Sequence, residues 1–159
     1  MVLWGQSAGA WSVNYYGYAY PEDPIVSGLI ADSGGSTAYV TGDEAHTNFS
    51  AVAARAGCAG GDAAAELACM QRVDGATVRA LYSNTTGVNF GPVADDVTVF
   101  ADNAARARAG RVARLPAIVG VNSREGSGFA PWNAETGVNE TQVVQGSKII
   151  VCPTLAEIA

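Results

Sequence analysis

The pentapeptide at residues 5–9 is the feature that most constrains how this chain can fold. Gly5, Ser7 and Gly9 form the G-x-S-x-G pattern of a nucleophile elbow, in which a serine sits on a strained turn between a strand and a helix. Glycine lacks a Cβ atom, so glycines at the two flanking positions let the backbone fold that tightly. The apolar run at residues 1–4 predicts the strand, and residues 8–13 predict a helix with small side chains on one face. The alternative interpretation is a glycine-rich turn in which Ser7 has no chemical role.

Two further apolar runs predict strands, at residues 25–33 and 115–121. The order of strand, helix and strand predicts a parallel sheet and an α/β fold class. Between the runs, the Thr41-x-x-Glu44 spacing of a capping box predicts a helix that ends near Arg55. Further helices are predicted at about 62–71 and 76–82, so this stretch resembles an insertion on the sheet. We expect residues 1–159 to form one partial α/β domain, with no second domain.

The pattern is weaker after Gly126. Residues 132–145 are polar and predict a loop with at most one helical turn, and residues 148–151 are apolar. Cys152 and Pro153 predict the first residues of a helix, because proline is favoured at that position.

The composition excludes several classes of function. Hydrophobic residues make up 48% of the chain and charged residues 15%, which is typical of a folded globular domain. The net charge is −6 and no dense cluster of Lys and Arg is present, which argues against nucleic acid or an anionic membrane as a partner. No apolar run approaches the roughly 20 residues that a bilayer span needs. The charge balance itself says little about small-molecule substrates.

Several residues indicate secretion. Cys58 and Cys69 are close in sequence, and a bridge between them would close a short loop, although they can also be reduced thiols. Three tripeptides satisfy the rule for N-glycosylation, beginning at Asn48, Asn84 and Asn139. The N-terminus lacks the pattern of a signal peptide. We therefore expect an internal piece of a longer secreted protein.

Four segments together resemble the type-B carboxylesterase and cholinesterase family of α/β hydrolases, in particular its fungal secreted members. Residues 3–13 resemble the elbow segment of the family, and residues 28–34 the strand that follows it. The stretch from Cys58 to Cys69 resembles a family disulfide loop, and residues 119–126 resemble the segment that carries the acid of the catalytic triad.

The resemblance implies a role for several residues. Ser7 would be the nucleophile, Glu125 the triad carboxylate, and the backbone N–H of Ala8 a donor to the oxyanion hole. Ser33 would support the site by hydrogen bonding, although a plain strand-end serine is the alternative. A neutral serine needs a histidine to take its proton, and a carboxylate orients and stabilises that histidine. A solvated loop glutamate balanced by Arg124 is the alternative for Glu125.

The chain also departs from the family pattern. Gln6 stands where the common elbow has Glu. The fold requires a histidine after the triad acid, but no histidine follows Glu125 in this sequence. The single histidine, His46, lies in the predicted insertion, where a surface or core-edge role is the simpler interpretation. The glycine-rich oxyanion loop is absent. Cys152 resembles a cysteine of a later family segment. The stretch between Glu125 and Cys152 is shorter than in the family, which predicts a deletion, a mis-joined gene model or a truncated product. In each case the thiol of Cys152 has no assigned partner.

The resulting prediction is a carboxylic ester hydrolase that acts through a serine nucleophile and an acyl-enzyme, without metal or organic cofactor. We expect the isolated chain to be inactive or nearly so. The alternatives are a non-catalytic, cholinesterase-like interaction module and a non-functional gene fragment.

Overall fold

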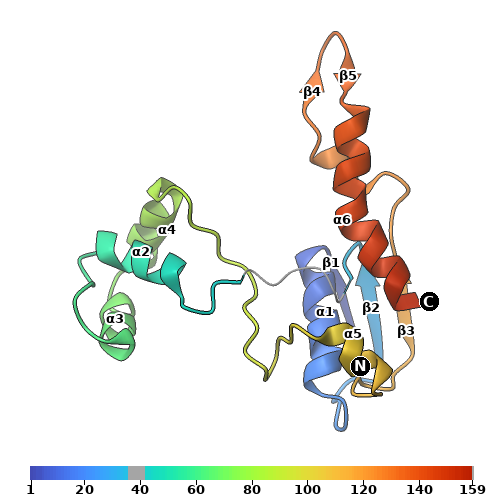
Figure 1. Cartoon of the computed structure of the whole chain (residues 1–159), viewed down its shortest axis with the longest axis horizontal. Coiled ribbons are helices and arrows are strands. Elements are labelled where there is room, and N and C mark those ends of the chain that lie inside the picture. The colour runs from blue at the N-terminus through green and yellow to red at the C-terminus, as the bar shows by residue number, and fades with distance from the viewer. Residues whose placement is uncertain (36–41, 159) are drawn as a thin grey trace. The chain divides into compact units, whose positions relative to one another are not determined.

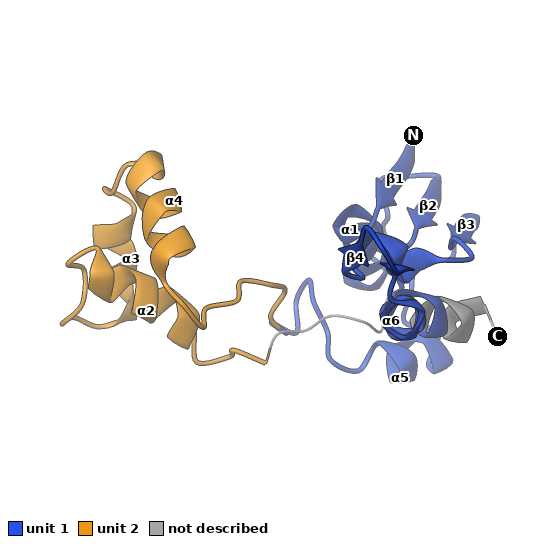
Figure 2. Cartoon of the chain, turned by 90° about the horizontal axis from the view of Figure 1, so that it is seen from above, with its two compact units in different colours: residues 1–40, 94–159 blue, residues 41–93 orange. Residues whose placement is uncertain are grey.

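The chain forms two compact units, residues 1–40 with 94–159 and residues 41–93 (Figure 2). The structure is a computed structural model that describes residues 1–35 and 42–158, with side chains described as far as Cys152. We call the first unit the sheet unit and the second the helical unit. The helical unit includes the predicted insertion, and the single domain expected from the sequence stays a prediction.

A parallel three-stranded sheet organises the sheet unit. Its strands are β1 (Val2–Gln6), β2 (Gly28–Asp32) and β3 (Ala117–Gly120), in the order β1-β2-β3. The helix α1 (Ala8–Ala19) connects β1 to β2 (Figure 1). The parallel α/β sheet predicted from the sequence is therefore confirmed.

The two faces of the sheet are covered differently. On one face, Ala10 and Val13 of α1 pack with Ala31 of β2, and all three are buried. On the other face, Trp4 and Ile118 occupy the same row across the strands and are 67% and 64% exposed. Parallel sheets are normally covered on both faces. The sheet unit thus presents apolar side chains that its own helices leave in contact with solvent.

The segment after β3 differs from the prediction. It contains the 3₁₀ helix η1 (Glu125–Gly128), the short strands β4 (Trp132–Asn133) and β5 (Gly137–Val138), and the helix α6 (Glu140–Ile158) (Figure 1). The predicted loop over 132–145 and the predicted helix start at Cys152 and Pro153 are therefore wrong, because one helix already begins at Glu140.

Contacts outside the helix explain why α6 begins so early. The Asn139 side chain accepts a hydrogen bond from the Gln142 N–H at 3.2 Å, which satisfies one of the free amides at the helix start. Val143, in the next turn, is only 2% exposed. The polar composition of 132–145 indicated a loop, but it suits a helix that is exposed on most of its surface.

The helix α5 (Asn103–Arg108) precedes β3 in the sheet unit. The helical unit consists of α2 (Thr47–Arg55), α3 (Ala63–Met70) and α4 (Gly75–Asn84). The carboxylates of Asp62 and Asp74 cap α3 and α4 by accepting backbone N–H groups.

The start of α2 was predicted wrongly. Thr41 lies outside the described residues, and the helix begins at Thr47 instead of near residue 41. The Asp43 carboxylate accepts hydrogen bonds from the Thr47 N–H at 2.8 Å and the Asn48 N–H at 3.0 Å. The residue before the helix, His46, has a left-handed backbone with φ 54°. The capping carboxylate is thus Asp43, and the turn between it and the helix delays the helix start.

A disulfide bond joins Cys58 to Cys69, as the sequence and the family resemblance indicated. Cys58 is buried in a small core with Val52, Ala53 and Met70. A bridge with a sequence separation of 11 residues stabilises the folded state by about 2–3 kcal/mol. Cys152 is exposed and free.

Candidate active site

Ser7 lies on the turn between β1 and α1, with φ 56° and ψ −119°. Residues with a Cβ rarely occupy this region, and doing so costs on the order of 1–3 kcal/mol. Such a conformation persists only where surrounding contacts fix it. The strained strand-to-helix turn is the geometry that a nucleophile elbow requires.

Backbone hydrogen bonds fix both peptide groups of Ser7. Its N–H donates to the Asp32 carbonyl at 2.9 Å, which ties the turn to the end of β2. Its own carbonyl accepts from the Ala10 N–H at 2.9 Å and the Trp11 N–H at 3.1 Å. The turn therefore cannot relax without breaking contacts to the sheet and to the first turn of α1.

Close packing at Gly5 also fixes the turn. A Cβ atom at Gly5 would overlap the carbonyl group of Gly9 and lie 2.9 Å from the Ala10 nitrogen. A Cβ atom at Gly9 would meet no heavy atom within 4 Å. The expectation that both glycines are needed for space is therefore wrong for Gly9, because that position faces open space.

The hydroxyl of Ser7 is available for chemistry. Ser7 is the N-cap residue of α1, yet its side chain makes no capping hydrogen bond. Ala8, which follows it, is exposed, and its N–H belongs to the first turn of α1, where amides lack partners within the helix. An amide at a helix N-terminus favours negative charge, which suits the predicted oxyanion role of Ala8.

Glu125 lies beyond the end of β3 and is held by three donors. Its Oε1 atom accepts hydrogen bonds from the Ser33 hydroxyl at 2.6 Å, the Asn122 N–H at 2.6 Å and the Asn122 amide at 3.3 Å. Ser33 is 5% exposed and has φ 60°. The Asn122 amide also donates to the Ser33 hydroxyl at 3.3 Å. One carboxylate oxygen is thus anchored, and the side chain has a defined orientation.

Asn122 is the residue of this arrangement that sequence reasoning missed. It lies at the predicted strand end, within the segment that resembles the triad-acid region, but no role was assigned to it. The available signal was its position, since polar residues after a parallel strand gather at the carboxyl edge of the sheet.

Packing of η1 against α6 fixes the backbone next to Glu125. A Cβ atom at Gly126 would overlap the Val143 carbonyl, so a larger residue does not fit there. The Gly126 N–H donates to the Ser147 hydroxyl at 2.9 Å. The helix that sequence reasoning placed wrongly is therefore the helix that positions the loop with the predicted acid.

The strand register brings the serine and the carboxylate to one edge of the sheet. Gln6, Asp32 and Gly120 are aligned across the three strands, and Ser7 follows the first of them. The Ser33 N–H donates to the Gly120 carbonyl at 2.7 Å. A hollow of about 390 Å³ lies at this edge, lined by Gln6, Asp32, Ser33, Gly120, Val121 and Asn122.

Arg124 does not neutralise Glu125. Its guanidinium donates to both carboxylate oxygens of Glu140, at 2.7 and 2.9 Å. That hydrogen bonding and the charge of Glu140 raise the pKa of Arg124. The structure therefore gives no support to the alternative in which Arg124 balances a solvated Glu125.

The sheet unit contains no histidine, because the single histidine of the sequence, His46, belongs to the helical unit. In the described part of the chain, no group of three or more His, Cys, Asp and Glu side chains is arranged to hold a metal ion. The helices described here are too short or too polar to cross a membrane.

A model of the carboxylesterase family matches residues 1–152. The chain belongs to this family. The match confirms the type-B carboxylesterase resemblance that the elbow and acid segments indicated. As a member of the carboxylesterase family, the chain is part of a family of hydrolases.

Two fungal relatives share substantial sequence with this carboxylesterase-family chain. It is 46% identical over 123 residues to chlorogenic acid esterase from Aspergillus niger, an alignment that covers 76% of this chain and 24% of the relative. It is 33% identical over 146 residues to secreted lipase 5 from Gibberella zeae, covering 83% of this chain and 27% of the relative. The chain thus spans about a quarter of the length of the curated relatives it matches.

Solved esterase structures share its fold. The crystal structure of Aspergillus niger EstA superposes with a TM-score of 0.66 at 25% identity, covering 94% of this chain and 30% of that chain. A PNB esterase superposes with a TM-score of 0.64 at 17% identity, covering 98% of this chain and 34% of that chain. The fold is a partial α/β-hydrolase fold, as predicted.

The packing at the elbow predicts different effects of alanine at its two glycines. Gly5→Ala places a methyl group inside the Gly9 peptide and should lower the free energy of unfolding by about 2–4 kcal/mol, as overpacking against backbone does. Gly9→Ala is the matched control and should change it by less than about 1 kcal/mol. Urea unfolding followed by tryptophan fluorescence measures both variants, since all three tryptophans lie in the sheet unit. Equal effects of the two variants would contradict the packing described for the elbow.

Proposed function

We propose that this chain forms part of a secreted carboxylic ester hydrolase in which Ser7 is the nucleophile. The observation that carries the proposal is the strained backbone of Ser7, held at the same edge of the sheet as an anchored carboxylate. A protein that only binds a partner has no physical need for a serine in this conformation, since the strain costs stability.

The proposed reaction proceeds in two steps. The Ser7 oxygen attacks the ester carbonyl while its proton passes to a histidine, and the carbonyl oxygen takes up negative charge near the Ala8 N–H. The C–O bond to the alcohol then breaks, and the histidine returns the proton to the departing alcohol. Water releases the acid from the acyl-enzyme in the same manner. Glu125 orients the histidine and stabilises its cation.

Glu125 is suited to that role by the way its oxygens are used. Ser33 and Asn122 bind Oε1, and no hydrogen bond to Oε2 exists among the described residues. We propose that Oε2 is the atom that accepts the histidine N–H. Because no histidine follows Glu125 in these 159 residues, we expect them alone to hydrolyse esters slowly or not at all, since a base is worth orders of magnitude in rate.

A small-molecule carboxylic ester is the proposed substrate. The relative from Aspergillus niger is named for chlorogenic acid, and it is 46% identical to this chain over the aligned 123 residues. Chlorogenic acid is therefore the first ester to test.

A chimaera tests the proposed nucleophile. The homologous segment of the Aspergillus niger enzyme is replaced by this chain, so that the rest of that enzyme supplies the groups that the sheet unit lacks. We expect hydrolysis of chlorogenic acid, and we expect Ser7→Ala to lower kcat by at least about 10³-fold. Ser12→Ala is the matched control, because the Ser12 hydroxyl only donates to the Ala8 carbonyl within α1.

The chimaera separates the candidate functions. An active chimaera that keeps its rate after Ser7→Ala would contradict the assignment of the nucleophile. A chimaera that folds, as judged by circular dichroism, but hydrolyses no ester would contradict the esterase proposal and favour the non-catalytic interaction module.

Secretion of the parent protein is part of the proposal. One relative is named a secreted lipase, and the Cys58–Cys69 disulfide suits an oxidising compartment.

The three glycosylation tripeptides differ in whether the amide nitrogen of the asparagine donates a hydrogen bond. The Asn48 amide donates to the Asn89 carbonyl and the Asn84 amide to the Ala80 carbonyl. Asn139 is exposed between β5 and α6, and its side chain is used only as an acceptor.

We therefore expect Asn139 to carry the glycan when the chain is secreted from a eukaryotic host. A glycan is attached to the amide nitrogen, so a nitrogen free of hydrogen bonds in an exposed loop is the best acceptor. Mass spectrometry before and after treatment with peptide N-glycosidase should show a modified Asn139, and Asn139→Gln should remove most of the added mass. Asn48→Gln is the control and should leave it unchanged. A glycan on Asn48 with Asn139 unmodified would contradict this expectation.

A further inference from the structure

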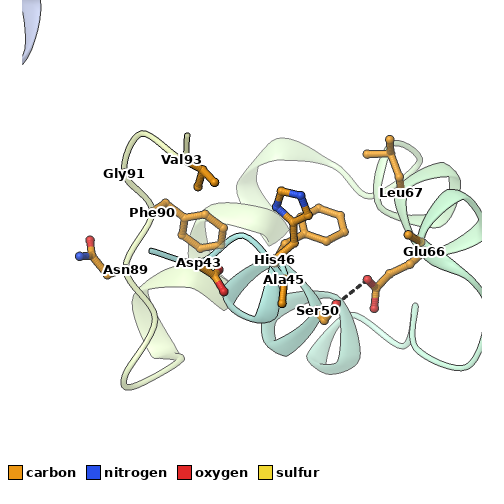
Figure 3. Close-up of a pocket in the computed structure, with 12 residues that line it drawn as sticks. Asp43, Ala45, His46, Ser50, Glu66, Leu67, Asn89, Phe90, Gly91 and Val93 are labelled. Atoms are coloured by element: carbon orange, nitrogen blue, oxygen red, sulfur yellow. Dashed lines mark hydrogen bonds between the residues drawn. The ribbon is translucent and has the colours of Figure 1, made fainter. Parts of the chain in front are cut away.

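The helical unit contains a pocket whose lining residues have no role in the proposed ester hydrolysis. Its volume is about 480 Å³, which lies within the range of about 300–1,000 Å³ that is typical of small-molecule sites. Figure 3 shows the extended segment with Phe90 and Val93 on one side, Glu66 and Leu67 of α3 on the other, and His46 between them. The lining residues all lie between 43 and 93, within one unit: Asp43, Ala45, His46, Phe49, Ser50, Ala63, Glu66, Leu67, Asn89, Phe90, Gly91 and Val93.

Specific contacts join the three parts of the chain that form the pocket wall: α2, α3 and the extended segment after α4. The Asn48 amide donates to the Asn89 carbonyl at 3.0 Å, which ties the extended segment to α2. The Phe90 ring meets the Tyr82 ring of α4 edge to face, with 5.7 Å between their centroids. The Ser50 hydroxyl donates to Glu66 Oε2 at 2.7 Å and links α2 to α3. The pocket is thus bounded by groups with defined positions.

Much of the pocket wall is apolar. Phe49 and Phe90 present aromatic rings, and Leu67 and Val93 present branched aliphatic side chains. Phe90 is 51% exposed and Leu67 is 49% exposed, so apolar surface remains in contact with water. Covering such surface with an apolar ligand is favourable because it removes apolar area from water.

The charges of the lining residues have one sign. Asp43 and Glu66 are carboxylates, and neither Lys nor Arg lines the pocket. Hydrogen bonds from the side chain of Thr47 and the backbone of Asn48 hold the pKa of Asp43 below its usual value, so this group is ionised at neutral pH. The second oxygen of Glu66, Oε1, makes no hydrogen bond in the part of the chain that the structure describes. An oriented carboxylate therefore borders an aromatic and aliphatic pocket.

We infer that this pocket binds a small organic cation with an aromatic body, of the phenylalkylammonium class. The ammonium group pairs with Glu66, and the apolar body lies against Phe49, Phe90 and Leu67. Aromatic faces attract a cation as well as apolar atoms, which adds to the effect of the carboxylate. An anionic ligand of the same shape meets repulsion from both carboxylates. None of the residues that line this pocket takes part in the proposed hydrolysis at Ser7, so either proposal can fail without the other.

The test uses three probes of one shape and the whole chain at pH 7.5. The probes are phenethylammonium, 2-phenylethanol and phenylacetate, which are cationic, neutral and anionic. His46 is the single histidine of the sequence and lines the pocket, so its ring C–H signals in NMR spectra report on this site alone. We expect a saturable shift of these signals with phenethylammonium, weaker binding of 2-phenylethanol and the weakest binding of phenylacetate.

Two variants test the role of Glu66. Glu66→Gln keeps an oxygen for the Ser50 hydroxyl but removes the charge. It should lower the affinity for phenethylammonium about threefold to fivefold and leave the affinity for 2-phenylethanol unchanged. Glu44→Gln is the matched control, because Glu44 is an exposed carboxylate outside the pocket lining and should have no effect.

Salt provides a measurement on the unaltered chain, which decides the question if the Glu66 variant does not fold. Raising the sodium chloride concentration from 20 to 500 mM should weaken the binding of phenethylammonium and leave the binding of 2-phenylethanol unchanged. The inference is overturned if the His46 signals do not shift saturably, if the neutral or anionic probe binds as tightly as the cation, or if the folded Glu66 and Glu44 variants behave alike.

Discussion

The positive φ of Ser7 is the constraint on which the rest of the proposed site depends. The chain must leave β1, turn sharply and enter α1 within a very short stretch. This is possible only because Gly5 has no Cβ atom, so that the Gly9 peptide packs directly against Gly5. The hydrogen bonds of Ser7 to Asp32, Ala10 and Trp11 then fix the turn between the sheet and the helix. The cost of the strained backbone is offset by these contacts, and the result is a serine whose hydroxyl is not used for capping.

A second set of contacts places the carboxylate at the same edge. Ser33 follows β2 and Asn122 lies beyond the end of β3, so parallel pairing brings both residues to the carboxyl edge. There the Ser33 hydroxyl and both the backbone N–H and the side-chain amide of Asn122 donate to Glu125 Oε1. The loop is fixed from the other side by the close approach of Gly126 to α6. The elbow and the acid are thus supported by separate parts of the sheet unit. On the face of the sheet opposite α1, the side chains of Trp4 and Ile118 are exposed.

Local patterns predicted the elements whose causes are local. The strand, turn and helix at the N-terminus depend on neighbouring residues, and the order of strand, helix and strand predicted the parallel sheet. The capping box predicted at Thr41 and Glu44, in contrast, does not start α2. The Cys58–Cys69 bridge was indicated by close spacing together with the family resemblance.

The features that were missed depend on contacts between distant residues. The helix α6 forms over a polar stretch because Val143 is buried and Gly126 packs against the helix, and neither contact is visible in a local pattern. The open space at Gly9 and the hydrogen bonds of Asn122 to Glu125 also require the three-dimensional arrangement. The lack of a histidine after Glu125, in contrast, is visible in the sequence itself.

The most direct test of the central claim is the backbone conformation of Ser7 in a crystal structure of the expressed chain. If the sheet unit forms the elbow by itself, Ser7 has a positive φ near 56° and its N–H donates to the Asp32 carbonyl. A Ser7 with negative φ, in a relaxed turn or a continuous helix, would contradict the claim that Gly5 and the end of β2 hold this serine in the geometry of a nucleophile.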